Sequence, residues 1–194
     1  MPDRVVAFVN QIIALNSEQQ EALRAVLKLK TIKRKEHLLR EGQVCNFAAF
    51  IVTGSLRYYY LIEGEEYTGQ FFFEHGWYAD YESYITGKPT TENIQALEHC
   101  EVLLLYKQDL ERLYAQYPVF EKFGRIMVER AFLGLKNKNK MLTLESPEER
   151  YLSMINERPM VFERVPLKYI ASYLSIQPES LSRIRKRLYD GRNS

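Results

Sequence analysis

The sequence predicts an α+β protein: an antiparallel β-barrel of jelly-roll type with flanking helices, a long helix and a small C-terminal helical domain. Three observations predict this architecture. Between residues 31 and 106, short apolar runs alternate with turn signals at intervals of roughly ten residues, as in barrels and sandwiches. Eleven of the 25 aromatic residues fall between Tyr58 and Tyr84. From residue 107 onward, apolar residues recur at helical spacing.

The amino-acid composition excludes several classes of protein. The chain has 194 residues, 46% of them hydrophobic and 27% charged, which excludes collagen-like and wholly disordered proteins. No apolar run approaches the roughly 18 residues of a membrane span, and the N-terminal residues 1–4 do not resemble a signal peptide. Cys45 and Cys100 lie far apart in sequence, as is typical of a reducing compartment. We therefore expect a cytoplasmic protein with no membrane partner.

The first 30 residues predict two helices. Apolar residues between 5 and 13 follow helical spacing, and Ser17 with Gln20 predicts a capping box for the second helix. Strands are then expected within 37–39, 47–52, 56–62, 67–73, 93–97 and 101–106. Residues 1–117 are assigned to this first domain.

A long helix is predicted for residues 118–145. After Pro118, apolar side chains occupy nearly every face, so the helix must be covered on more than one side. One face would pack on the barrel and another on a second copy of the chain, which makes a homodimer our expectation. The alternative is an ordinary core helix of a monomer. Ser146-Pro147-Glu148-Glu149 then predicts a new helix start and a domain boundary, because Ser caps and Pro suits the first turn.

The third domain, residues 146–194, contains the pattern of a helix-turn-helix. Two short helices fit residues 166–173 and 178–189, and their apolar residues are spaced to share a small core. The second helix would enter the DNA major groove. Its base-facing and phosphate-facing candidates are Gln177, Glu179, Ser180, Ser182, Arg183, Arg185, Lys186 and Arg187. The alternative is an amphipathic hairpin with a solvated basic face.

Charge distribution agrees with a nucleic-acid partner. The formal net charge is +2. Residues 163–194 carry seven Lys and Arg against three Asp and Glu, whereas residues 1–162 carry 20 against 22. A slightly acidic body with a basic C-terminus is expected when the last segment meets a polyanion, although exposed helices are often basic for solubility alone.

The segment IASYLSIQPESLSRIRK, residues 170–186, closely resembles the helix-turn-helix of Crp/Fnr-type transcription regulators, and most of all the short members common in Bacteroidetes. The segments REGQ at 40–43, FIVTGSLR at 50–57 and ALEHCEV at 96–102 resemble landmarks of the cyclic-nucleotide-binding-like barrel of that family. The order of elements agrees along nearly the whole chain.

This resemblance implies a sequence-specific regulator that binds palindromic double-stranded DNA as a homodimer. Carried over by position, Glu179, Ser182 and Arg183 occupy the base-reading places, and the pattern Glu-x-x-Ser-Arg resembles the branch that reads TTGAT-like half-sites. A small-molecule effector and RNA polymerase are the further partners that the family implies.

The resemblance is imperfect in the helix-turn-helix domain. Ser175 stands at a turn position usually held by Gly, where a left-handed backbone would strain a residue with a Cβ. The sequence continues only about five residues past the recognition helix, so we expect no full β wing and weaker DNA binding.

The ligand positions also depart from the family. The Glu that would bind a ribose hydroxyl falls at Asp80, and the Arg-Ser pair that would bind a cyclic phosphate falls at Thr90 and Thr91. Lys88 is the only nearby cation, and no Arg lies between Arg57 and Arg112. We therefore expect a ligand other than cyclic AMP, or none. The tyrosine-rich segment could surround an aromatic or neutral molecule, or could be ordinary core.

No catalytic or metal site is predicted. His37, His75 and His99 show no metal-ligand spacing, and two cysteines cannot ligate an iron–sulfur cluster. Cys45 could be a thiol sensor or an inert core residue. We expect a regulator that is not an enzyme and that needs no resident cofactor. The alternative function is a degenerate small-ligand-binding barrel with marginal DNA binding.

Overall fold

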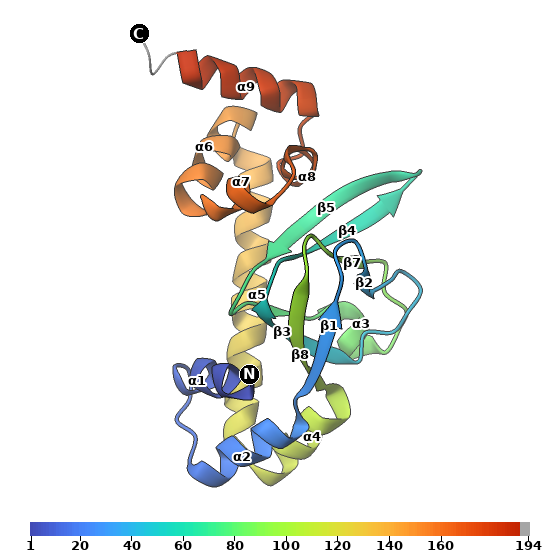
Figure 1. Ribbon diagram of the computed structural model, residues 1–194, viewed down its shortest axis with the longest axis vertical. Coiled ribbons are helices and arrows are strands. Elements are labelled where there is room, and N and C mark those ends of the chain that lie inside the picture. The colour runs from blue at the N-terminus through green and yellow to red at the C-terminus, as the bar shows by residue number, and fades with distance from the viewer. Residues whose placement is uncertain (191–194) are drawn as a thin grey trace.

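The computed structural model describes residues 1–190 and has the long helix α5 as its spine (Figure 1). The β-barrel lies beside the middle of this helix. The N-terminal helices and α4 gather near its first turns, and helices α6 to α9 gather at its far end. The helices are α1 (Pro2–Asn10), α2 (Ser17–Val26), α3 (Tyr81–Thr86), α4 (Lys107–Gln116), α5 (Val119–Leu144), α6 (Pro147–Glu157), α7 (Met160–Arg164), α8 (Leu167–Tyr173) and α9 (Pro178–Asp190).

The barrel consists of two antiparallel four-stranded sheets. One has the strand order β1-β8-β3-β6 and the other β2-β7-β4-β5, so neighbours are mostly distant in sequence, as in a jelly roll. The strands are β1 (Lys28–Ile32), β2 (His37–Leu39), β3 (Phe47–Thr53), β4 (Leu56–Ile62), β5 (Glu65–Phe72), β6 (Trp77–Tyr78), β7 (Asn93–Ala96) and β8 (Cys100–Tyr106). The predicted fold class is confirmed.

Strands β3 and β8 are continuously apolar because both of their faces are covered. Side chains alternate between the two faces of a strand. Accordingly, Ala49 and Ile51 point into the barrel core, whereas Phe50 and Val52 belong to a separate cluster outside the sheet. On β8, Leu103 and Leu105 belong to the same outer cluster.

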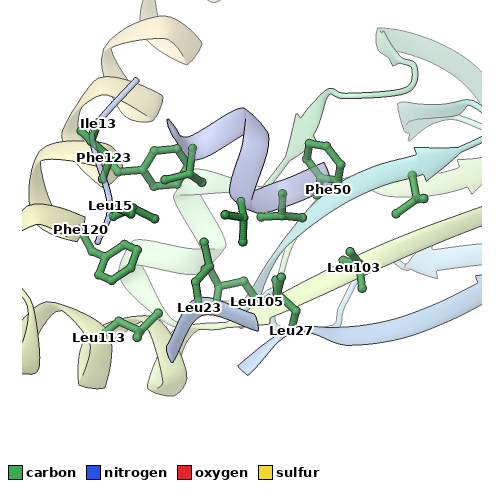
Figure 2. Packing of buried hydrophobic residues seen from close by; sticks show 14 residues of the cluster. Ile13, Leu15, Leu23, Leu27, Phe50, Leu103, Leu105, Leu113, Phe120 and Phe123 are labelled. Atoms are coloured by element: carbon green, nitrogen blue, oxygen red, sulfur yellow. The ribbon is translucent and has the colours of Figure 1, made fainter. Parts of the chain in front are cut away.

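The outer cluster joins the sheet to the N-terminal helices, α4 and the first turns of α5. Figure 2 shows Phe120 and Phe123 of α5 packing with Leu113 of α4 and Leu23 of α2. Phe120 is 1% exposed. Truncating such a buried phenylalanine to Ala costs about 3–5 kcal/mol. This cluster therefore holds the base of α5 rigidly against the barrel.

One detail of the N-terminal prediction is wrong. The capping box of α2 is formed by Asn16 and Gln19, one residue earlier than the predicted Ser17 and Gln20. The Asn16 side chain accepts a hydrogen bond from the Gln19 backbone N–H at 2.9 Å, and the Gln19 side chain accepts one from the Asn16 N–H at 3.0 Å. An Asn caps a helix as well as a Ser does, and here it sits in the extended conformation that a cap requires.

The C-terminal helices follow α5 after a capped turn. Ser146 and Glu149 form the capping box of α6, with Pro147 in the first turn. The core of these helices is continuous with strand β5, because Phe71 of β5 contacts Tyr173 of α8 with ring centroids 5.4 Å apart. The expected absence of a full wing depends on residues 191–194, which lie outside the described residues. The domain limits 117/118 and 145/146 stay predictions.

Candidate nucleic-acid interface and ligand sites

The helix-turn-helix is formed by α8, a tight turn and α9. Ala171 is fully buried where the two helices approach each other. Ser175 has a φ of 55°, the left-handed backbone that its position predicted. The turn closes with hydrogen bonds from the Ser175 N–H to the Ser172 carbonyl at 3.1 Å and from the Ile176 N–H to the Ala171 carbonyl at 3.0 Å. These bonds fix the angle at which α9 leaves the turn.

Helix α9 presents one polar face to solvent. Leu181 and Ile184 face the core, whereas nearly all of the predicted DNA-contacting side chains are exposed. Only Ser180 is half-buried among them. The Ser182 hydroxyl donates to the Pro178 carbonyl at 3.0 Å, a bond within the helix that a base edge can replace. The exposed set is Gln177, Glu179, Ser182, Arg183, Arg185, Lys186 and Arg187.

Arg187 already has an acidic partner within the protein. Its guanidinium forms an ion pair with Glu148 in the first turn of α6. The pair braces the C-terminal half of α9 against α6. Sequence reasoning assigned Arg187 to DNA phosphate and missed this contact, because the two residues are 39 positions apart.

The helix-turn-helix is docked on the β4–β5 hairpin of the same chain. The Ser172 hydroxyl on α8 accepts from the Thr68 N–H at 2.8 Å and donates to the Glu66 carbonyl at 2.9 Å. Arg158, just after α6, donates to the Gln70 side chain at 2.7 Å and to the Phe71 carbonyl at 2.9 Å. Helix α8 of the helix-turn-helix is thus hydrogen-bonded to the backbone of β5.

Two further arginines strengthen this joint. Arg57 of β4 is fully buried and pairs with Glu66 at 2.6 Å, and its guanidinium stacks on the ring of Tyr169 from α8. Arg164 at the end of α7 pairs with Glu74 at 2.7 Å and with Glu98 at 2.5 Å.

The charge state of the Arg164 joint is fixed. Hydrogen bonding to Arg164 lowers the pKa of Glu74 to about 2, despite an opposing effect of burial. Because the carboxylate stays charged at neutral pH, the contact between α7 and the barrel is an ion pair under ordinary conditions.

The predicted ligand residues do not form one polar site. The Asp80 side chain caps α3 by accepting from the Ser83 N–H at 3.2 Å, and the Thr90 hydroxyl accepts from the Glu92 N–H at 2.9 Å. Both residues are buried, whereas Lys88 and Thr91 are exposed. Asp80 and Thr90 are therefore occupied by bonds within their own segment.

A half-buried carboxylate that sequence reasoning did not single out lies between two tyrosines of the barrel. Glu92 accepts hydrogen bonds from Tyr60 at 3.1 Å and Tyr78 at 3.2 Å. Burial, with the nearby charge of Asp80, raises the pKa of Glu92 to about 7. An anionic phosphate would here meet two acidic side chains. The electrostatics at this place therefore oppose binding of a cyclic nucleotide.

The middle of α5 carries an exposed apolar stripe, defined by Val128, Phe132 and Leu135. These side chains are 44%, 63% and 61% exposed and recur at i, i+4 and i+7, which places them on one face. In the single chain this face is uncovered.

Metal and thiol chemistry find no support in the described part of the chain. Within residues 1–190, no three His, Cys, Asp or Glu side chains gather closely enough to hold a metal ion. Cys45 and Cys100 are buried, and burial raises the pKa of both thiols, which makes them unreactive. No helix within the same residues is long and apolar enough to cross a membrane.

The jelly-roll barrel, the long helix α5 and the helix-turn-helix together have the architecture of a solved protein of the Crp/Fnr family. Residues 29–117 match the model of the cyclic nucleotide-binding domain family. No curated protein matches the sequence.

Solved structures of other proteins are similar to this structure over most of the chain. FixK2 from Bradyrhizobium japonicum is similar with a TM-score of 0.74 at 18% identity, covering 86% of each chain. A protein of the Crp/Fnr family from Eubacterium rectale gives a TM-score of 0.71 at 15% identity, over 91% of this chain and 85% of the other. The c-di-GMP-responsive regulator CLP from Xanthomonas campestris gives 0.68 at 15% identity, over 91% and 93%. These likenesses establish the fold.

Proposed function

We propose that this chain is a sequence-specific transcription regulator that binds palindromic DNA as a homodimer. The observation that carries the proposal is the exposed polar face of α9, held by a closed turn on a helix-turn-helix. Arg183 suits guanine and Glu179 suits the cytosine amino group, while Arg185 and Lys186 are placed for phosphates. By family resemblance, the half-sites are TTGAT-like.

Dimerisation uses the apolar stripe of α5. Pairing of Val128, Phe132 and Leu135 with the same residues of a second copy removes this exposed apolar face from water. Two α9 helices then have to span half-sites about 34 Å apart, one turn of B-DNA. A single helix-turn-helix of modest charge binds DNA weakly, so the dimer supplies the affinity.

The effector, where there is one, is not cyclic AMP. This part of the proposal is supported by the acidic pair Asp80 and Glu92 and by the exposure of Lys88 and Thr91. Titration calorimetry with cyclic AMP is expected to give no heat of binding. A saturable heat of binding in the wild-type protein would contradict it.

The DNA proposal is tested by gel shift with a TTGAT-type palindrome and a scrambled duplex of equal length. Wild-type protein is expected to prefer the palindrome. Arg183→Ala should lose about 1–3 kcal/mol of binding and relax the preference at one base pair. Arg34→Ala, an exposed arginine on the barrel, is the matched control and should bind normally.

Two results would contradict the proposal. One is equal affinity for palindrome and scrambled DNA, which would favour the alternative of a ligand-binding barrel with marginal DNA binding. The other is an equal loss in the Arg183 and Arg34 variants, which would mean that only total charge matters. Lys186→Ala separates these cases. Loss of a phosphate contact should weaken binding to both duplexes alike and lower the dependence of binding on salt concentration.

A further inference from the structure

A small cavity of about 130 Å³ lies outside the barrel interior, between α3, α4 and α5. Its walls come from β6, α3, α4 and the first half of α5, with Ala48 of β3 and Leu105 of β8 behind them. The predicted ligand residues Asp80, Lys88, Thr90 and Thr91 do not line it. The cavity is therefore distinct from the barrel site that the sequence suggested.

The size and the walls of the cavity restrict what can occupy it. Most of the lining side chains are aliphatic or aromatic, and none is charged. An apolar protein cavity of about 150 Å³ accommodates benzene. A nucleotide or a peptide segment is too large, and an anion or cation would lose its hydration without gaining a partner.

Several polar side chains line the cavity without a hydrogen-bond partner within residues 1–190. Tyr81, Tyr84 and Tyr114 line it, and their hydroxyls form no hydrogen bond within residues 1–190. The indole Nε1–H of Trp77, another lining residue, is buried without an acceptor in the same part of the chain. A buried donor is normally paired, so the Trp77 N–H is available to a ligand. The three half-buried tyrosine hydroxyls are available too, because they have no partner within the same residues.

The tyrosines stay neutral donors at physiological pH. Burial raises the pKa of Tyr114 to about 12 and also raises the pKa of Tyr81 and Tyr84. Gly124 of α5 makes room for one of them, because a Cβ at this position would lie 2.0 Å from the Tyr114 hydroxyl oxygen. The glycine thus lets a hydroxyl approach the helix backbone at the wall of the cavity.

We propose that this cavity binds a small, neutral, phenol-sized aromatic molecule whose polar atom hydrogen-bonds to the unpaired tyrosine hydroxyls and the Trp77 N–H. The ligand would touch α3 of the barrel and α5 together. Its regulatory meaning rests on the proposed function: occupancy sets how α3 packs on the dimer helix. Val128, at the rim, belongs to the apolar stripe, so the cavity adjoins the expected dimer contact.

The test uses full-length protein and ligand-observed ¹⁹F NMR with 4-fluorophenol, and with 4-fluorobenzoate as the charged counterpart. The phenol resonance is expected to broaden with increasing protein, and the benzoate resonance is not. Trp77 is the only tryptophan, so its fluorescence should change in parallel. Ala48→Leu fills the cavity and should weaken binding at least tenfold. Ala115→Leu, on the exposed side of α4, is the control that should bind normally.

A second variant tests the proposal even if the Ala48→Leu protein does not fold. Tyr114→Phe removes only the hydroxyl and should weaken phenol binding several-fold, whereas Tyr67→Phe, half exposed on β5, should not. The proposal is overturned by absence of broadening, by equal binding in Tyr114→Phe and wild type, or by binding that disappears as the dimer forms. That last outcome would assign the cavity to side chains of the second copy. The assay contains no DNA, so failure of the DNA proposal leaves its result unchanged.

Discussion

The guanidinium of Arg57 lies 3.6 Å from the ring centroid of Tyr169, which joins the barrel sheet to the first helix of the helix-turn-helix. The ring of Tyr59 lies 4.2 Å away, so the cation is placed between two aromatic rings. Arg57 is 0% exposed, and its only acidic partner is Glu66 within residues 1–190. A buried charge of this kind is stable only while its partners stay in place. The position of α8 is thus coupled directly to β4, in addition to the connection through α5.

Removing the Tyr169 ring should loosen this joint. Tyr169→Ala is expected to lower the free energy of unfolding by about 2 kcal/mol, because a half-buried ring and a cation–π contact are lost. Tyr169→Phe keeps the ring and should remain within about 0.5 kcal/mol of wild type. Urea unfolding measures both, with Tyr189→Ala, 71% exposed on α9, as the control. Equal losses in Tyr169→Ala and Tyr189→Ala would show that the stacking contributes nothing.

The ion pair between Arg164 and Glu74 predicts a loss of stability in acid. The folded protein holds the pKa of Glu74 at about 2, below its ordinary value of 4.5. A carboxyl with a depressed pKa stabilises the fold above the unfolded value, and this contribution is lost as the pH falls through that window. Urea unfolding between about pH 5 and pH 2.5 should therefore show a smaller decline in Arg164→Gln than in wild type. Parallel curves for the two proteins would contradict the prediction.

Glu92 predicts the opposite dependence near neutral pH. Burial raises the pKa of Glu92 to about 7, so the folded state binds a proton that the unfolded state releases at lower pH. The contribution of Glu92 protonation to the free energy of unfolding is therefore complete below about pH 4.5 and is lost as the pH rises through about 7. In wild type the free energy of unfolding should fall by on the order of 2 kcal/mol between pH 5 and pH 8 because of this group. Glu92→Gln should remove this fall. Glu65→Gln, exposed at the start of β5, should leave the curve unchanged.

The sequence predicts the parts of this fold whose signals are local. Strands β3 and β8 are recognisable because coverage on both faces requires uninterrupted apolar runs, and the helix-turn-helix because its core positions recur at helical spacing. Ser175 was predicted to adopt a left-handed backbone from its place in the turn, and it has one. The capping residue of α2 was missed because Asn16 and Ser17 are both good caps and each is followed three residues later by a Gln.

The joint between barrel and helix-turn-helix has no local signal. The Ser172 hydroxyl and the Thr68 N–H are 104 positions apart, and Arg57 lies among tyrosines in a strand that gives no hint of a second covered face. The buried Glu92 looked like an ordinary surface residue beside a turn. The base-reading roles of Glu179, Ser182 and Arg183 stay predictions, because exposure on α9 permits DNA contact without demonstrating it.

The turn of the helix-turn-helix contains a correctable strain. Ser175 has a φ of 55°, which costs a residue with a Cβ about 1 kcal/mol relative to Gly. Ser175→Gly should therefore raise the free energy of unfolding by about 0.5–1 kcal/mol. Ser182→Gly, inside α9, should lower it by a similar amount, because Gly destabilises a helix interior. Thermal unfolding of the two variants provides the comparison, and destabilisation by Ser175→Gly would refute the strain.

The apolar stripe of α5 is expected to be the contact between the two copies of the dimer. Phe132 is 63% exposed in the single chain and lies at the centre of the stripe, between Val128 and Leu135. Because a dimer would bury this side chain on both copies, Phe132→Asp would place two like charges in an apolar contact and should yield a monomer. Asn137→Asp, exposed on the opposite side of the same helix, adds the same charge outside the stripe and should leave the dimer intact. Sedimentation equilibrium distinguishes the two. A Phe132→Asp protein that stays dimeric would place the contact elsewhere, and a wild type that is monomeric at every concentration would remove dimerisation from the proposed function.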